Sequence, residues 1–112
     1  MKIYISGPIT KDPNAKERFY KTQKRLENWC MVDVINVFNI PRHKELEENG
    51  GQWLDYMKID IAELTKADFI YMLYGWRKSR GAKIERKIAK MLNIPVMYET
   101  RKIARAVKNG IL

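Results

Sequence analysis

The chain has 112 residues, of which 46% are hydrophobic and 11% aromatic, enough for one core but not for two, so we predict a single domain over residues 1–112. Its 22 lysines and arginines outnumber 13 acidic residues, and the net charge of +9 favours a ligand that carries phosphate. The apolar runs are far shorter than a membrane span and the chain begins directly with a strand pattern, so we expect a cytoplasmic protein without a membrane partner. A single cysteine, Cys30, excludes an internal disulfide, and with only one histidine, His43, we predict no metal and no other cofactor.

Residues 2–6 predict a first strand that ends at the turn Gly7-Pro8. A glycine allows the backbone to approach a ligand closely, and ligands of open α/β sheets lie beyond the carboxyl ends of the strands. Ser6, Gly7 and Pro8 are therefore candidate pocket residues, although a plain turn would use the same residues.

The segment that follows predicts a helix, a strand and a loop. Asn14 and Glu17 resemble a capping box, and an apolar face opposite a basic face then predicts an amphipathic helix. Residues 32–38 are rich in β-branched side chains and predict the second strand. Residues 43–51 are polar without a hydrophobic period, which predicts a loop of the length that often covers an active site, with His43 as a solvent-exposed residue.

Residues 52–66 resume helical spacing and contain one acidic residue without a cationic neighbour. Asp55 and Glu63 each have a lysine three residues on, which predicts solvated ion pairs. Asp60 has no cation at helical spacing. A carboxyl group placed in this way can hold a proton, as a general acid must.

Residues 69–73 predict a strand, followed by a loop and a helix that Ser79 caps. Glu85 lies beside the apolar stripe of this helix, and none of its neighbours three or four residues away is a cation. Its side chain leans toward Gly81 and Ala82, where missing bulk leaves room for a ligand. The helix N-terminus favours an anion and would keep Glu85 ionised, as a carboxylate nucleophile requires. A half-exposed glutamate that shields the helix edge is an alternative of equal weight.

The last elements are a strand over residues 95–98 and a helix over residues 101–112. Strands alternate with helices along the whole chain. This order predicts a parallel sheet with helices on both faces and right-handed connections.

Three groups of motifs have a specific combined spacing: residues 3–10, Trp53 with Tyr56-Met57 and Asp60, and Ala67-Asp68 with Gly75-Trp76 and the run from Ser79 to Glu85. On these motifs, over residues 2–98, the chain resembles the nucleoside 2-deoxyribosyltransferase-like superfamily. The likeness is greatest to a small branch often met in phage and bacterial genomes.

The resemblance implies a flavodoxin-like, Rossmann-like three-layer sandwich with a parallel sheet of four or five strands. It implies cleavage of the N-glycosidic bond of a (deoxy)nucleoside or its 5′-monophosphate. Glu85 matches the glutamate that attacks C1′ of the sugar, and Asp60 matches the aspartate that helps protonate the leaving base. Ser79 matches the serine that binds the sugar or a 5′-phosphate. Water would resolve the glycosyl-enzyme intermediate in a hydrolase, and a second base in a transferase.

The resemblance also implies further contacts and a homo-oligomer, at least a dimer. Asp68 matches an acidic residue that can orient the sugar, although a local cap would also use it. Trp76 can stack on a nucleobase or seal the sheet edge. Tyr4 matches a tyrosine near the sugar, but its position in a strand favours a core role.

Two other functions compete with glycosidic cleavage. One is a nucleotide-binding or sensing module that kept the pocket and lost turnover, because residues 108–112 do not match the C-terminal segment that completes the family's active site. The other is nucleic-acid binding through the charge of +9. We rank it last, because the cations are spread over several helix faces and are not interleaved with an aromatic platform.

Overall fold

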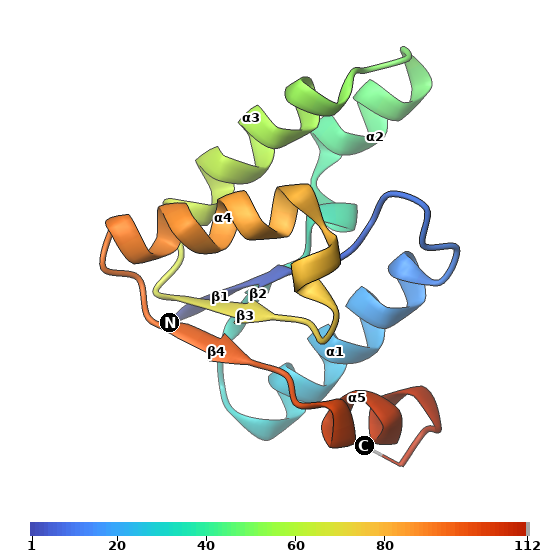
Figure 1. Cartoon of the computed structure of the whole chain (residues 1–112), viewed down its shortest axis with the longest axis vertical. Helices are drawn as coiled ribbons and strands as arrows, with labels where there is room; N and C mark the ends of the chain where they lie inside the picture. The colour runs from blue at the N-terminus through green and yellow to red at the C-terminus, as the bar shows by residue number, and fades with distance from the viewer. Residues whose placement is uncertain (112) are drawn as a thin grey trace.

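The computed structural model describes residues 1–111, and its centre is a four-stranded, all-parallel sheet with the strand order β2-β1-β3-β4 (Figure 1). In chain order the elements are β1 (Lys2–Ser6), α1 (Ala15–Trp29), β2 (Asp33–Ile35), the 3-10 helix η1 (Val37–Asn39), α2 (Pro41–Glu48), α3 (Trp53–Leu64), β3 (Phe69–Met72), the 3-10 helix η2 (Trp76–Lys78), α4 (Arg80–Met91), β4 (Val96–Tyr98) and α5 (Arg101–Lys108). The final residue of the predicted last helix, residue 112, lies outside the described residues.

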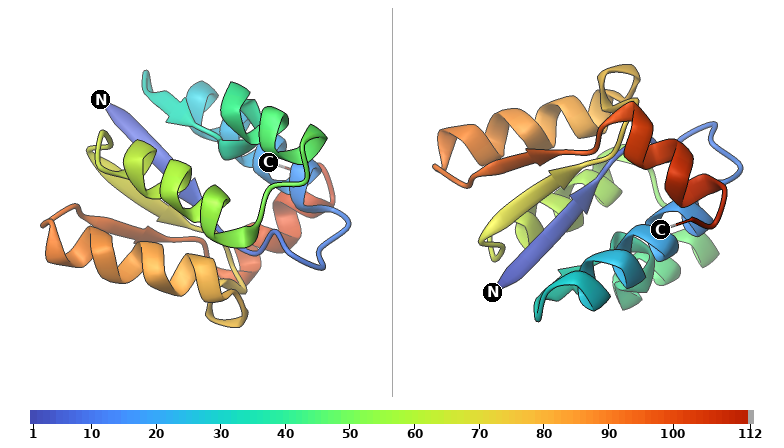
Figure 2. Two further views of the ribbon diagram at one scale, coloured as in Figure 1. Left: turned by 90° about the horizontal axis from the view of Figure 1, so that it is seen from above. Right: turned by 90° about the horizontal axis from the view of Figure 1, so that it is seen from below.

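Helices cover both faces of the sheet. The chain moves from β1 to β2 in one direction and then through β3 to β4 in the other, so right-handed connections place α1 on one face and α3 and α4 on the opposite face. Helix α5 packs beside α1, and α3 packs between α2 and α4 (Figures 1 and 2). The predicted flavodoxin-like, three-layer α/β architecture is confirmed.

The two central strands form the middle of the core. In β1 and β3 almost every side chain is buried, as expected for strands covered on both faces, and Tyr4 lies opposite Ile70 in the register. Beyond β1, a Cβ atom on Gly7 would lie 2.8 Å from Leu73 Cβ. The glycine therefore permits the close approach of the two chain segments that leave the carboxyl edge of the sheet.

Two local predictions in the first half of the chain need correction. The predicted second strand is present but shorter than expected: it ends at Ile35, because the Asn36 side chain accepts a hydrogen bond from the Phe38 amide and turns the chain into η1. The Asn14 side chain makes no cap of α1. Instead the Asp12 carboxylate accepts from the Asn14 amide at 2.9 Å.

The predicted loop over residues 43–51 is also wrong, because residues 41–48 form α2. Pro41 occupies the first turn of this helix, where its fixed φ is favourable, and His43 is its only buried residue. A helix that buries one side chain has no apolar period, which is why the pattern did not predict it.

Of the two ion pairs predicted near the ends of α3, one forms and the other does not. Glu63 pairs with Lys66 at 2.9 Å as expected, but Asp55 forms a capping box with Gln52 and has no ion pair among the described residues.

Within residues 1–111, every helix falls short of the length and apolar character that a membrane crossing requires.

Candidate active site

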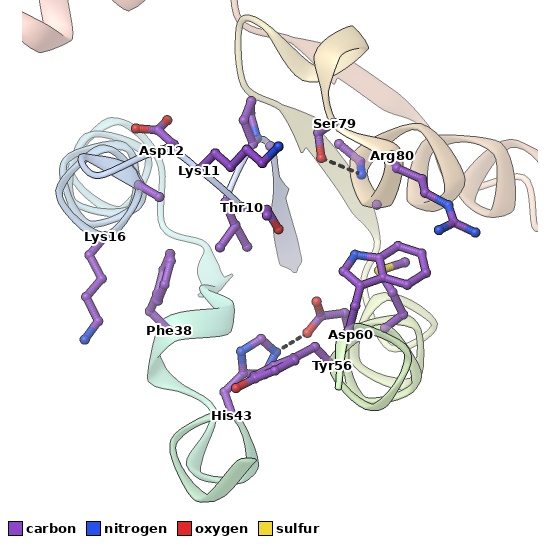
Figure 3. A pocket seen from close by; sticks show the side chains of 18 of the residues that line it. Thr10, Lys11, Asp12, Lys16, Phe38, His43, Tyr56, Asp60, Ser79 and Arg80 are labelled. Carbon is purple, nitrogen blue, oxygen red and sulfur yellow. Dashed lines mark hydrogen bonds and ion pairs between the residues drawn. The ribbon is translucent and has the colours of Figure 1, made fainter. Parts of the chain in front are cut away.

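A cavity of about 1090 Å³ opens at the carboxyl edge of the sheet. It lies between the loop after β1, helix α2, and the first turns of α3 and α4 (Figure 3). Seven of the ten predicted site residues line it: Gly7, Pro8, Asp60, Ser79, Gly81, Ala82 and Glu85. The structure therefore brings together residues from three distant parts of the chain.

Glu85 is buried, with 5% of its surface exposed. The Tyr4 hydroxyl donates to Oε2 at 2.8 Å, and the Ser6 hydroxyl donates to Oε1 at 2.6 Å. Both donors belong to β1 and are two residues apart, so they point to the face of the sheet that α4 covers. The alternative of a half-exposed glutamate is wrong, and Tyr4 serves both the core and the site.

Burial raises the pKa of Glu85 to about 8. The nearby charge of Asp60 also raises this pKa, whereas the hydrogen bonds from Ser6 and Tyr4 lower it. The loss of water around the carboxyl group outweighs the two hydrogen bonds. The expectation that the helix N-terminus keeps Glu85 ionised is wrong, because Glu85 lies in the second turn of α4 and the effect fades within the first. Burial also raises the pKa of Tyr4 well above 10, so its phenol remains a donor.

Asp60 reaches the same cavity from α3 and is 4% exposed. Its Oδ1 is hydrogen-bonded to Nε2 of His43, and the ring of Tyr56 packs edge-on against His43 with centroids 5.1 Å apart (Figure 3). The prediction that His43 faces solvent is therefore wrong. The site contains a buried histidine-aspartate pair opposite the buried glutamate.

The first turn of α4 forms one wall of the cavity. The Ser79 hydroxyl accepts from the Ala82 amide at 3.1 Å, which confirms the predicted cap and leaves the hydroxyl proton free to donate. The space beside Gly81 is smaller than expected, because Met57 Sδ lies 3.1 Å from where a Cβ atom would stand. The glycine thus allows α3 to pack closely on α4.

The loop that follows β1 forms the opposite wall, and sequence reasoning passed over most of it. Thr10 and Lys11 both line the cavity, and Lys11 has a left-handed backbone with φ 64° (Figure 3). Such a conformation is unusual for a lysine, and the sequence did not predict it.

Arg18 of α1 connects this loop to the segments that follow β3 and β4 at the same edge of the sheet. Its guanidinium donates to the Tyr74 carbonyl at 2.8 Å and lies 3.5 Å from the Asp12 carboxylate and 3.6 Å from Glu99. Burial raises the pKa of Glu99, and the Arg18 charge lowers it. The contacts join the cavity loop to the end of β4.

Three predicted substrate contacts lie outside the cavity lining. Ser6 is one of them, and it contacts the site through its hydrogen bond to Glu85. Asp68 precedes β3 at the amino edge of the sheet, opposite the cavity, where it accepts from the Lys2 amide at 2.8 Å. This bond joins residues 66 positions apart in the sequence, so it differs from the local cap that was the alternative. Trp76 is absent from the cavity lining and packs against Tyr98 with ring centroids 5.9 Å apart, which fits the role of sealing the sheet edge.

Within the described part of the chain no three His, Cys, Asp or Glu side chains are grouped so that they could hold a metal ion. Comparison with curated proteins found no match to the chain. Comparison with solved structures found none either. A family model described as "Domain of unknown function (DUF4406)" matches residues 1–98, most of the chain and all of the cavity lining. The chain therefore belongs to the DUF4406 family.

Proposed function

We propose that the protein cleaves or transfers the N-glycosidic bond of a (deoxy)nucleoside or its 5′-monophosphate. The observation that carries this proposal is that two buried carboxyl groups, Glu85 and Asp60, line one cavity from separate helices, each held by hydrogen-bonding side chains. Two carboxyl groups across an oxocarbenium-like transition state are what retaining glycoside cleavage uses. The resemblance of residues 2–98 to nucleoside deoxyribosyltransferases adds the substrate class.

In the proposed reaction the Glu85 carboxylate attacks C1′ of the sugar. The bond between C1′ and the base nitrogen breaks, its electron pair leaves with the base, and Asp60 supplies the proton that the base takes. Water or a second base then attacks C1′, and the bond between C1′ and Glu85 breaks with its electron pair going to the Glu85 carboxylate. The attacking group gives its proton back to Asp60. Tyr4 donates to one oxygen of Glu85 and Ser6 to the other. These hydrogen bonds orient Glu85 as the nucleophile, and they stabilise its carboxylate when it leaves C1′ in the second step.

The raised pKa of Glu85 sets the pH at which this reaction runs. With a pKa of about 8, only roughly a tenth of the empty protein holds an ionised Glu85 at pH 7. The nucleophilic form therefore increases as the pH rises through 8. We expect kcat/KM to increase with pH over the same range, because it reports on the free enzyme.

Incubation with a panel of deoxynucleosides, ribonucleosides and their 5′-monophosphates, with and without acceptor bases, tests the proposal by chromatography of the released base. Glu85→Gln should abolish release, and intact-protein mass spectrometry should detect a sugar adduct on the wild-type chain but not on the variant. Glu99→Gln is the matched control, because Glu99 is also a buried glutamate with a raised pKa but does not line the cavity. Base release that survives Glu85→Ala would remove Glu85 from the mechanism.

A nucleotide-binding module without turnover is the second candidate. The observation in its favour is the same burial of Glu85, which keeps the nucleophile protonated in most empty molecules at neutral pH. Calorimetry that detects binding of a nucleoside monophosphate, with no base released over long incubation at pH 7 and pH 9, would support it. Turnover that depends on Glu85 would exclude it.

The resemblance also leads us to propose a homo-oligomer, at least a dimer. Sedimentation velocity over a range of protein concentrations tests this, and a monomer at all concentrations would contradict it.

A further inference from the structure

The segment that runs from η2 through α4 carries an unneutralised positive charge. Seven cations lie on it: Arg77, Lys78, Arg80, Lys83, Arg86, Lys87 and Lys90. Its only acidic residue is Glu85, which points inward to the cavity. Among residues 1–111, none of these seven cations takes part in an ion pair.

The five cations on α4 face the same way. At about 100° per residue, they cover an arc of roughly 120°, and its centre lies roughly 130° around the helix from the centre of the buried residues, Ala82, Glu85 and Ala89. Four of the five are exposed, and Arg86 is half-buried at the edge toward β4. Helix α4 forms an outer layer of the molecule in both views of Figure 2.

Aromatic side chains flank this arc on both sides. Toward β4, the Arg86 guanidinium lies 4.8 Å from the ring of Trp76 and 5.8 Å from that of Tyr98, and its Nε donates to the Tyr98 hydroxyl at 2.7 Å. Toward α3, Arg80 lies 4.4 Å above the ring of Trp53. The premise that the cations are not interleaved with aromatic side chains is wrong for this part of the surface.

We infer that the seven cations together with Trp53, Trp76 and Tyr98, here called the α4 surface, bind single-stranded nucleic acid. Free lysines and arginines match the phosphates of a strand, and the exposed rings of Trp53 and Tyr98 with the guanidinium planes match unstacked bases. A duplex hides its base faces, so it would use only the charges. Binding at this surface does not depend on the glycosidic chemistry proposed above.

The α4 surface reaches the cavity, because Lys78, Arg80 and Trp53 also line its mouth. A strand bound along α4 would thus place one nucleotide beside the cavity entrance. The 12 residues of α4 span about 18 Å, which is long enough for a short strand to contact several cations at once.

The expected salt dependence follows from the number of phosphates contacted. For single strands the slope of log K against log salt is about −0.7 for each phosphate neutralised. If the five α4 cations each contact a phosphate, the slope is about −3.5, and affinity falls roughly 100-fold between 50 and 200 mM salt.

Fluorescence anisotropy with a labelled oligothymidylate about 12 nucleotides long, within the known range of single-strand site sizes, tests the inference. The triple variant Lys83→Ala, Lys87→Ala, Lys90→Ala should reduce the magnitude of the slope by about 2. The matched control is Lys102→Ala, Arg105→Ala, Lys108→Ala on α5, which removes the same charge on the other side of the sheet. This control should keep the wild-type slope.

A second pair of variants tests the aromatic contribution. Tyr98→Leu should weaken binding at least about 5-fold, as loss of base stacking does, whereas Tyr20→Leu on α1 should not. Both tyrosines are about half exposed, at 45% and 56%. If thermal melting finds either tyrosine variant unfolded, the lysine variants decide alone.

Three results would overturn the inference. The first is equal weakening by the α4 and α5 triple variants, which would mean that net charge alone drives binding. The second is a duplex of the same sequence bound as tightly as the single strand. The third is an α4 triple variant that binds polyglutamate or anionic vesicles more weakly than the wild type does but binds the oligonucleotide equally well. This result would assign the surface to an acidic protein or to a membrane.

Discussion

Replacing Glu85 by glutamine should change how the stability of the protein depends on pH. In the folded chain burial raises the pKa of Glu85 from its ordinary 4.5 to about 8. Between these two values the unfolded chain is ionised at this position while the folded chain keeps its proton. The folded state then binds more protons than the unfolded state, so the stability that Glu85 contributes is complete below pH 4.5 and is lost as the pH rises to 8.

The size of the effect follows from the same two values. At about 1.36 kcal/mol per pH unit, the interval from 4.5 to about 8 corresponds to about 5 kcal/mol of unfolding free energy, of which about 4 kcal/mol falls between pH 5 and pH 8. Glutamine has nearly the same shape and does not titrate. The difference in stability between Glu85→Gln and the wild type should therefore move in favour of the variant by about 4 kcal/mol over this range.

Urea unfolding at half-unit steps from pH 5 to pH 9 measures this difference. Titrating groups that do not interact with Glu85 contribute equally to both proteins, so they cancel when the two curves are subtracted. The Glu99→Gln variant serves as a second reference, because burial raises the pKa of Glu99 as well but at a different place in the fold. Parallel curves for Glu85→Gln and the wild type would refute the reasoning that burial dominates the chemistry of this carboxyl group.

Three further substitutions give separate expectations. Ser6→Ala removes the donor 2.6 Å from Glu85 Oε1, so the pKa of Glu85 should rise above 8, and a carbon-13 NMR titration that finds it unchanged or lower would contradict the role of this hydrogen bond. Gly7→Ala places a methyl group 2.8 Å from Leu73 Cβ, and urea unfolding should find a loss of about 1–3 kcal/mol in stability. Thr22→Val replaces a buried hydroxyl that has no hydrogen-bond partner among the described residues, so its unfolding free energy should rise by about 1 kcal/mol, and a decrease would point to a partner for Thr22.

Helices and strands with a clear hydrophobic period could be predicted from the sequence. Contacts between residues far apart in the sequence could be predicted only in part. The helical spacing of α3 and α4 singled out Asp60 and Glu85, since an acidic residue without a cationic neighbour stands out on a basic chain, and the structure brings both to one cavity. That Tyr4 and Ser6 donate to Glu85 could not be read from spacing. The partners are 81 and 79 positions apart, and only the register of β1 beneath α4 brings them together.

His43 was missed for a different reason. It belongs to a short helix that buries one side chain, so neither hydrophobic period nor composition separates α2 from a polar loop. Pro41 at the start of the helix was the available signal. The protonation of Glu85 was misjudged because the helix dipole is a local effect of tenths of a kcal/mol, whereas burial of a carboxylate costs several.

The central place of β1 in the sheet has a consequence for synthesis. Strand β1 is synthesised before both of its neighbours in the sheet, β2 and β3, and β3 is completed only at Met72. Until then the apolar side chains of Ile3 and Ile5 have no permanent cover, and nascent chains with unpaired strands are prone to aggregate. We expect nascent chains that end before Phe69 to be protease-sensitive and to recruit chaperones, and released chains that extend past Tyr98 to resist digestion.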